Sequence, residues 1–246
     1  MKRVLILGYG LLCYAVFFAV FLWSIWFLWT MDTLSPKLPW LSALVVDACL
    51  LAAFAVQHSV MARQGFKRVW TRIVPREAER STYVLLASVV LLAIIVLWQP
   101  LPGVVWHVHA AGTVLVLNAL FALGWLLVLV STFLIDHFDL FGLKQAWRCW
   151  QGVPYEPPTF RTPGPYRMVR HPIYLGFVIA FWSAPLMTTG HLFFAVMCTA
   201  YMLLAIQFEE RDLIRYHGED YKVYRSGVSM IVPWPARKKQ AEGASR

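Results

Sequence analysis

The chain has 246 residues, of which 59% are hydrophobic and only 14% are charged, and it carries a net charge of +9. An ordinary soluble domain has about 25% charged residues, and one soluble core of this size could not bury so much apolar surface. The composition therefore excludes a soluble globular enzyme and indicates a membrane protein. The basic residues are dispersed over several loops, so we expect no nucleic-acid partner.

Six apolar segments follow one another along the chain. They lie at residues 4–29, 41–61, 81–98, 110–134, 172–188 and 191–208. The first four are long enough to cross a hydrocarbon core of about 30 Å as helices, and lipid leaves helices as the expected form because it offers the backbone no hydrogen bonds. The last two are short, and we expect them to form a tight helical hairpin that turns at Met187, Thr188 and Thr189. The sequence predicts an all-α, polytopic membrane helical bundle with about five to six transmembrane segments.

The basic residues predict the orientation of this bundle. Of the 22 Lys and Arg, all except Lys37 lie before the first segment, between the second and third, between the fourth and fifth, or after the sixth. Cytoplasmic loops carry such an excess of positive charge. We therefore expect a multi-pass protein of the inner (cytoplasmic) membrane with both termini in the cytoplasm, its basic loops in contact with membrane lipid headgroups.

Polar chemistry is concentrated in the second half of the chain. Residues 1–134 are predicted to form a four-helix membrane bundle, and residues 135–235 to form the cofactor-binding and catalytic part, which includes the helical hairpin. Residues 236–246 are polar and small, and we expect a disordered tail. The four cysteines are scattered without metal-ligand spacing, and no metal motif is present, so we expect no metal.

Two polar groups near the predicted cytoplasmic ends of apolar segments are candidates for acid–base chemistry. His58 lies near the end of the second segment. Asp136, His137 and Asp139 follow the fourth segment, and a histidine beside carboxylates is able to act as a general base. The competing interpretation of the second group is a polar helix end that stops at Gly142.

A third group surrounds the predicted start of the fifth segment. Pro172 suits the first position of a helix, and His171 before it is restricted to extended backbone. The free N–H groups and positive dipole end of such a helix form an anion site, which Arg167 and Arg170 would reinforce. The competing interpretation is an interfacial belt of Arg and Tyr side chains that contact lipid headgroups.

A fourth group is the adjacent carboxylate pair Glu209 and Glu210, at the end of the sixth segment. Neighbours on a helix point about 100° apart, so the two carboxylates cannot bind the same partner. One of them would hold an amino group or a ribose hydroxyl, and the other would pair with Arg170 or Arg211. The competing interpretation is a solvated helix end with weak local ion pairs.

These last two groups, in this order and spacing, resemble the integral-membrane methyltransferases of the isoprenylcysteine carboxyl methyltransferase and phospholipid methyltransferase superfamily. The resemblance covers roughly residues 160–235. It is carried by Gly164, Pro165, Tyr166, Arg170, His171, Pro172, Tyr174, Gly176, Glu209, Glu210, Leu213, Gly218, Tyr221, Tyr224, Val228 and Pro233. Residues 57–63, 79–84 and 132–145 resemble the bacterial methanethiol S-methyltransferases within it.

The resemblance implies that S-adenosylmethionine is the cofactor and that a small thiol, most simply methanethiol, becomes dimethyl sulfide. It also implies a cofactor site formed by Tyr166, Arg170, His171, Pro172, Tyr174, Leu175, Gly176, Glu209 and Glu210. The chemistry of the cofactor agrees with these residue types. Its carboxylate suits the helix start, its ammonium or ribose suits a glutamate, and its sulfonium suits the ring of Tyr166 or Tyr174.

Methyl transfer to a thiol needs the thiolate, so we expect a base. His137 is the first candidate, assisted by Asp139, and Asp136 and His58 are the reserves. Three other functions remain open at this point. They are methylation of isoprenylcysteine, phospholipid or another thiol, a non-enzymatic transport or accessory role, and reduction with a nicotinamide cofactor, since membrane sterol reductases are similar to this superfamily.

Overall fold

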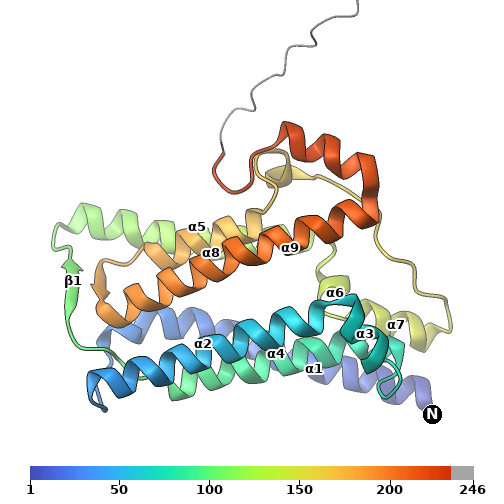
Figure 1. Cartoon of the computed structure of the whole chain (residues 1–246), viewed down its shortest axis with the longest axis horizontal. Coiled ribbons are helices and arrows are strands. Elements are labelled where there is room, and N and C mark those ends of the chain that lie inside the picture. The colour runs from blue at the N-terminus through green and yellow to red at the C-terminus, as the bar shows by residue number, and fades with distance from the viewer. Residues whose placement is uncertain (234–246) are drawn as a thin grey trace, which may run out of the picture.

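A computed structural model describes residues 1–233, and these residues are mostly helical (Figure 1). Within this part of the chain, five helices are long and apolar enough to cross a membrane: α1 (Lys2–Thr30), α2 (Trp40–Ala62), α4 (Arg76–Leu97), α5 (Ala111–Ile135) and α9 (Thr189–Gly227). A sixth apolar helix, α8 (Pro172–Trp182), is shorter. The predicted membrane helical bundle is thereby confirmed. The tail predicted at residues 236–246 lies outside the described residues.

Short elements connect these helices. They are the 3-10 turns η1 (Met31–Thr33) and η2 (Gly164–Arg167), the helices α3 (Gln64–Trp70), α6 (His137–Leu140) and α7 (Leu143–Gln151), and the strands β1 (Val104–His107) and β2 (Leu186–Thr188).

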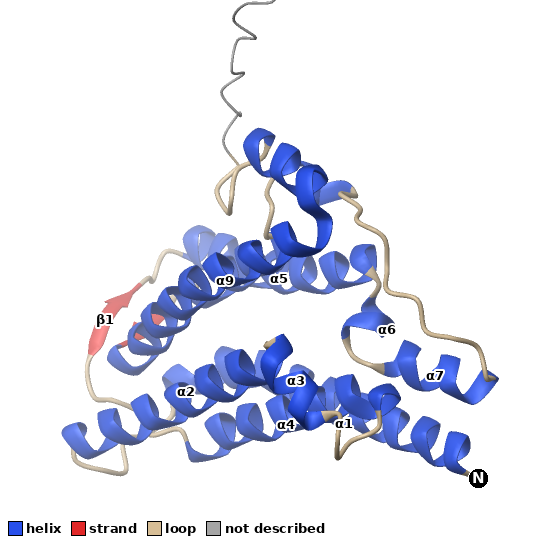
Figure 2. Ribbon diagram, turned by 45° about the vertical axis from the view of Figure 1, so that its right-hand side comes forward, coloured by secondary structure: helices blue, strands red, loops and turns tan. Residues whose placement is uncertain are grey.

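The long helices form two layers (Figures 1 and 2). Helices α1, α2 and α4 pack together in one layer, with α7 against α1 and α4, and α5, α8 and α9 form the other. The N-terminus and the basic helices α3 and α7 lie at one end of the bundle, and β1 lies at the opposite end. This arrangement puts the predicted cytoplasmic loops on one side, as the charge pattern requires.

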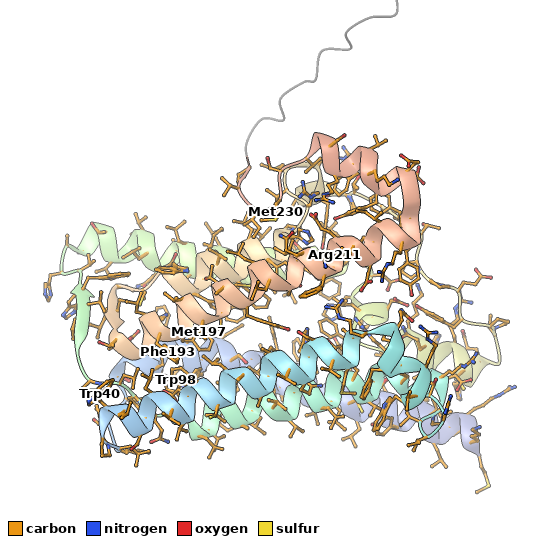
Figure 3. The ribbon with its side chains drawn as sticks, in the orientation of Figure 1. Trp40, Trp98, Phe193, Met197, Arg211 and Met230 are labelled. Atoms are coloured by element: carbon orange, nitrogen blue, oxygen red, sulfur yellow. The ribbon has the colours of Figure 1, made fainter. Side chains whose placement is uncertain are left out.

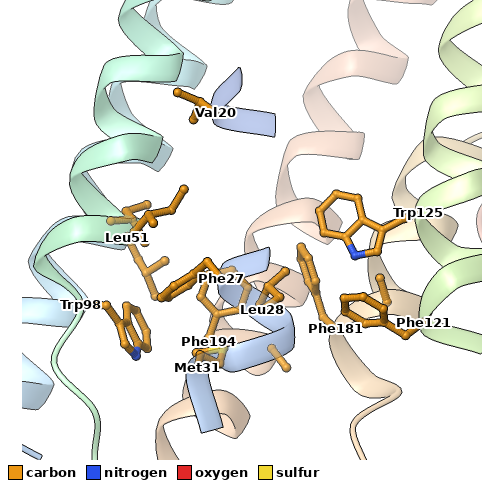
Figure 4. Packing of buried hydrophobic residues seen from close by; sticks show 14 of the residues in the cluster. Val20, Phe27, Leu28, Met31, Leu51, Trp98, Phe121, Trp125, Phe181 and Phe194 are labelled. Carbon is orange, nitrogen blue, oxygen red and sulfur yellow. The ribbon is translucent and has the colours of Figure 1, made fainter. Parts of the chain in front are cut away.

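A buried apolar cluster joins the two layers (Figure 4). Phe27 of α1 and Phe194 of α9 meet edge to face, with ring centroids 6.4 Å apart, and Trp125 of α5 meets Phe181 of α8 in the same way at 6.4 Å. The outward faces stay apolar as well, since Trp26, Leu115 and other large side chains are exposed. Exposed apolar faces on long helices are what contact with lipid requires.

The connection between α8 and α9 corrects the sequence prediction. A helix was expected over residues 172–188, but α8 ends at Trp182 and the chain then runs extended into β2. Pro185 explains the break, because proline restricts the residue before it to extended backbone. The 11 residues of α8 span only about 16 Å, roughly half of a hydrocarbon core. Helix α8 is therefore too short to cross a hydrocarbon core by itself.

Backbone polar groups of the extended segment after α8 form hydrogen bonds with the connection between α4 and α5, which contains β1. Strand β2 pairs antiparallel with β1, with Met187 opposite Trp106. The indole N–H of Trp106 donates to the carbonyl of Ala184 at 2.9 Å, and the N–H of Val108 donates to that of Pro185 at 2.9 Å. The sheet thus holds the turn of the predicted α8–α9 hairpin. The turn was expected at Met187, Thr188 and Thr189, but it is longer and runs over residues 183–188.

Helix α9 continues far beyond the predicted apolar segment 191–208 and bends at Gly218. This residue has φ 56° and ψ −127°, which only glycine adopts without strain. After the bend, the last turns of α9 fold back over the loop before α8 (Figure 1). Tyr221, Tyr224 and Arg225 are thereby carried toward the start of α8.

Candidate active site

The start of α8 is held by the chain segment that follows α9. The backbone N–H of Arg170 donates to the carbonyl of Ser229 at 2.8 Å, and that of His171 donates to Met230 at 3.1 Å. His171 is the residue before the helix, with extended φ, and Pro172 is its first residue. The helix start was predicted correctly at this position. Its first N–H groups have no partner within the helix.

Glu210 is the centre of a buried ionic network at this place. Its side chain is 3% exposed, and its Oε1 accepts hydrogen bonds from Arg170 Nε at 2.7 Å and His171 Nε2 at 3.2 Å. Its other oxygen lies 3.0 Å from Arg225 Nε. Arg170 also donates through Nη1 to the carbonyls of Arg225, at 3.1 Å, and Val228. The ion pair between Arg170 and Glu210 therefore links the start of α8 to the end of α9.

Glu209 points away from this network and is much more open. Its side chain is 45% exposed, and it accepts a hydrogen bond from the hydroxyl of Tyr174 at 2.9 Å. His171 Nδ1 lies 3.9 Å from the same oxygen. An ionised carboxylate has room for about four hydrogen bonds, so Glu209 retains capacity for a ligand. The predicted pairing of one glutamate with Arg170 is confirmed for Glu210, and a ligand-binding role of Glu209 stays a prediction.

Aromatic and polar side chains of α2 and α4 face this region. The hydroxyl of Tyr83 on α4 lies 3.0 Å from the ring nitrogens of His58 on α2, and Ser59 shares a 3.0 Å hydrogen bond with Tyr201 of α9. The Tyr83 hydroxyl lies close enough to Glu209 and Tyr201 to interact with them electrostatically, and Tyr174 lies equally within reach of Tyr83. The cluster around Glu209 therefore includes the predicted His58.

Sequence reasoning assigned no role to Tyr83 or Tyr201. Both tyrosines lie in apolar helices, where most aromatic residues only pack. The available signal was a hydroxyl group in an otherwise apolar stretch, about one turn after Arg80 for Tyr83 and about two turns before Glu209 for Tyr201.

Three polar atoms of α2, α5 and α9 are buried without a hydrogen-bond partner. They are Tyr221 Oη, Gln57 Oε1 and Ser131 Oγ. Tyr221 is 2% exposed and lies within electrostatic range of Glu209, Glu210 and Arg170. Buried polar groups are rarely left unpaired, so the Tyr221 hydroxyl, beside the two glutamates, fits a site completed by a polar ligand. No metal-binding cluster of His, Cys, Asp or Glu is found among residues 1–233.

His137, the first candidate for the base, lies in different surroundings. Its ring is 3% exposed and stacks on Phe133 at 4.2 Å. Both ring nitrogens are occupied, by the hydroxyls of Tyr14 at 2.9 Å and Thr132 at 2.8 Å. Burial lowers the pKa of His137. These contacts favour a packing role between α1 and α5, and the base role stays a prediction.

Replacing His137 with glutamine separates these two roles. If His137 only packs, the variant should have normal turnover per folded molecule. Its free energy of unfolding should fall by about 1–3 kcal/mol, because buried polar groups lose their hydrogen-bond partners. Thermal unfolding and activity of the purified variant would measure both. A stable variant without turnover would return the base role to His137.

Asp136 and Asp139 organise the turn between α5 and α7. Asp136 has a left-handed backbone, with φ 97°; its carboxylate accepts the N–H of Asp139 at 3.2 Å and pairs with Lys144. Asp139 accepts a 2.7 Å hydrogen bond from Tyr155, and burial raises the pKa of Asp139. The polar helix end that was the competing interpretation describes these contacts well. Any catalytic role of either carboxylate remains a prediction.

The remaining predicted cofactor residues lie in η2 and in the first turns of α8. Tyr166 precedes the helix, and its backbone carbonyl accepts a hydrogen bond from the hydroxyl of Tyr224 at 2.5 Å. Burial raises the pKa of the Tyr166 side chain. Leu175 is half-buried, and its N–H closes the first helical turn on His171. Gly176 instead packs against Gly124 of α5, so the geometry shows a packing contact there.

Figure 3 labels two further residues near this end of α9. Arg211 stacks over the ring of Phe208, with its guanidinium carbon 5.6 Å from the ring centroid. Met230 lies 3.9 Å from the amide nitrogen of Gln207. Arg211 therefore does not take the place of Arg170 as partner of Glu210.

Comparisons with known proteins show which family this chain resembles. A family model described as phospholipid methyltransferase matches residues 108–220, which begin just after β1 and include both glutamates. The methanethiol S-methyltransferase of Mycobacterium tuberculosis is 52% identical over 244 residues, covering 96% of this chain and 99% of that protein. Methanethiol S-methyltransferase 1 of Bradyrhizobium diazoefficiens is 47% identical over 232 residues, covering 92% and 81%.

A relative with a different name is nurim of Rattus norvegicus, which is 31% identical over 182 residues, covering 70% of this chain and 69% of nurim. No solved structure matches the chain. The family match and the near full-length relatives confirm the resemblance that the motifs indicated. The chain is a multi-pass membrane methyltransferase, and it belongs to the methanethiol S-methyltransferase family.

Proposed function

We propose that this protein transfers the methyl group of S-adenosylmethionine to methanethiol and releases dimethyl sulfide. The names of the relatives support the acceptor, and the methyltransferase family supports a methyl donor. The structural observation that carries the proposal is the half-exposed Glu209 carboxylate, bonded to Tyr174 beside the start of α8. An acidic, aromatic site at a helix start suits a donor that carries a carboxylate, an ammonium and a sulfonium.

The residues around Glu209 fit each of these groups. The start of α8 suits the carboxylate of the donor. Arg170 and Arg225 share one buried partner, Glu210, so these three side chains together carry a net positive charge beside the start of α8. Glu209 suits the ammonium or a ribose hydroxyl. The ring of Tyr174, held by its own hydroxyl on Glu209, suits the sulfonium. When bound, the donor supplies an electrophilic methyl group, and these side chains hold and orient it.

The location and orientation of the protein are part of the same proposal. We place it in the bacterial cytoplasmic membrane with both termini in the cytoplasm, because the basic helices α3 and α7 share one end of the bundle with the N-terminus. The Glu209 cluster would then receive a water-soluble donor from the cytoplasm, while a small apolar thiol enters through lipid. Contact with anionic lipid would involve the basic loops at that end.

Glu209→Gln is expected to weaken binding of S-adenosylmethionine about 10- to 100-fold, because hydrogen bonds to charged groups contribute about 1.5–3 kcal/mol. Isothermal titration of the purified protein in detergent measures this. Glu219→Gln is the matched control, since it removes the same charge from an exposed side chain of α9. Equal affinity of both variants and the unmodified protein would exclude Glu209 from the cofactor site.

The function itself is tested by headspace gas chromatography of purified protein supplied with S-adenosylmethionine and methanethiol. Dimethyl sulfide that forms with the protein and falls in Glu209→Gln is the expected result. Protein that binds S-adenosylmethionine without forming dimethyl sulfide would point to a larger acceptor, such as the phospholipid in the name of the matching family. Protein that binds NADPH and not S-adenosylmethionine would point to a reductase instead.

A further inference from the structure

We propose that the methyl acceptor binds against α2 and α4, and that His58 there takes the proton from its thiol, with Tyr83 positioning the ring. This inference rests on the proposed function and adds the acceptor side of the site. His58 is half-buried near the end of α2, and the hydroxyl of the buried Tyr83 lies 3.0 Å from its ring nitrogens. The Tyr83 hydroxyl is in turn within electrostatic range of Glu209. His58 therefore lies across from the residues that would hold the donor.

The surroundings of His58 suit a small apolar acceptor. The ring of Phe54 stacks on His58 with centroids 5.2 Å apart, and it meets Tyr201 edge to face at 6.5 Å. Helix α2 faces lipid on its other side, where Val56 and Val60 are exposed. An alkyl thiol that arrives through lipid would meet an aromatic surface with one basic nitrogen group, and it would need no charged anchor.

The extent of the family matches supports this division. The phospholipid methyltransferase match begins at residue 108 and includes His171, Tyr174 and Glu209 but neither His58 nor Tyr83. The methanethiol S-methyltransferases match 92–96% of the chain, so they include α2 and α4 as well. Methyltransferases with different acceptors share the donor. The part outside residues 108–220 is therefore where residues specific for a thiol acceptor are expected.

The proposed step is balanced within this site. The thiol S–H bond breaks, and its proton passes to the unprotonated nitrogen of His58. The resulting thiolate forms a bond to the methyl carbon, while the bond from that carbon to the donor sulfur breaks and leaves its electron pair there. The sulfonium becomes a neutral thioether, and the imidazolium later releases its proton to water.

Several charged and titratable groups would influence His58. On α4 these are Tyr83 and Arg80, whose guanidinium carbon lies 5.1 Å from the Tyr83 ring centroid. On the other layer they are Tyr174 of α8 and Tyr201 and Glu209 of α9. Arg63, the residue that follows α2, forms an ion pair with Asp212 at 3.1 Å. A pH profile must therefore compare variants that differ only at His58.

The experiment measures dimethyl sulfide formation by the full-length protein and by His58→Gln from pH 6 to pH 10. General-base catalysis contributes about 10²- to 10⁴-fold, so we expect a loss of at least 100-fold at neutral pH. The loss should shrink as pH rises, because methanethiol then ionises without a base. Tyr83→Phe should show a smaller loss with the same trend, and His109→Gln, an exposed histidine beside β1, should show none.

Binding of S-adenosylmethionine to each variant reports whether it is folded. A folded His58→Gln that retains full turnover, or whose loss is the same at every pH, would overturn the inference. An unfolded His58→Gln moves the decision to Tyr83→Phe, for which a pH-independent loss would equally overturn it. Failure of the proposed function is distinguishable, because the unmodified protein would then form no dimethyl sulfide at any pH.

Discussion

Glu210→Gln is expected to abolish measurable binding of S-adenosylmethionine and to lower the unfolding temperature by on the order of 10 °C. Glu210 is 3% exposed and is the shared partner of Arg170, His171 and Arg225. Removing one member of a buried ionic network costs about 3–5 kcal/mol, because the remaining charges stay buried without compensation. The loss is larger than for Glu209 because this network joins two parts of the chain.

The effect on binding follows from what the network holds together. Arg170 connects the start of α8 to the carbonyl of Arg225, beyond the bend at Gly218. Without Glu210, two guanidinium groups would repel each other, and the end of α9 would separate from α8. Glu209 and Tyr174 would then no longer share one site.

Thermal unfolding and isothermal titration measure the two expected effects. Glu219→Gln again serves as the control, since its side chain is 78% exposed and its partner Lys222 is three residues away; such exposed pairs contribute about 0–1 kcal/mol. A Glu210→Gln protein that binds S-adenosylmethionine as tightly as the control would show that the network does not organise the cofactor site.

The apolar runs predicted the long helices well, because lipid offers the backbone no hydrogen bonds and a helix pairs its own N–H and C=O groups. Strand β2 was missed for a physical reason. Its partner β1 lies about eighty residues earlier, so that Met187 meets Trp106, and no local pattern reports such a pairing. The continuation of α9 beyond residue 208 was missed because a helix leaving the membrane becomes polar. Gly218 marked the bend, but a single glycine does not reveal its φ.

The site was predictable in its residue types and less so in its contacts. Two adjacent glutamates on a helix had to point apart, and the pairing of one with Arg170 was anticipated. Which of them would be buried depends on how α9 is rotated against α8, and this rotation is set by packing. His137 illustrates the same limit. Its residue type suits a base, yet its partner Tyr14 is 123 positions away on α1, and this contact was not visible in the sequence.

Gly176→Val is expected to reduce turnover at least 100-fold in protein that still inserts and folds. Gly176 lies where α8 crosses α5, and a Cβ atom there would be 2.6 Å from the carbonyl oxygen of Gly124 and 2.9 Å from the backbone nitrogen of Val128. Backbone atoms cannot rotate away, so the two helices must separate. Small residues at such crossings allow membrane helices to approach closely. Because α8 begins only one turn earlier, Tyr174 would move with it, and a misplacement of about 1 Å can cost 100-fold in rate.

Two companion variants show whether this loss comes from helix packing or from direct contact of Gly176 with the cofactor. Gly124→Ala places a Cβ 2.7 Å from the backbone nitrogen of Ala180, so it separates the same helices from the α5 side. Gly112→Ala adds a Cβ to α5 where no heavy atom lies within 4 Å, and it should leave turnover unchanged. Loss of activity in both Gly176→Val and Gly124→Ala would establish that close packing of α8 on α5 sets the position of Tyr174. Full activity of Gly124→Ala beside an inactive Gly176→Val would instead assign Gly176 to the cofactor site, as the family resemblance implies.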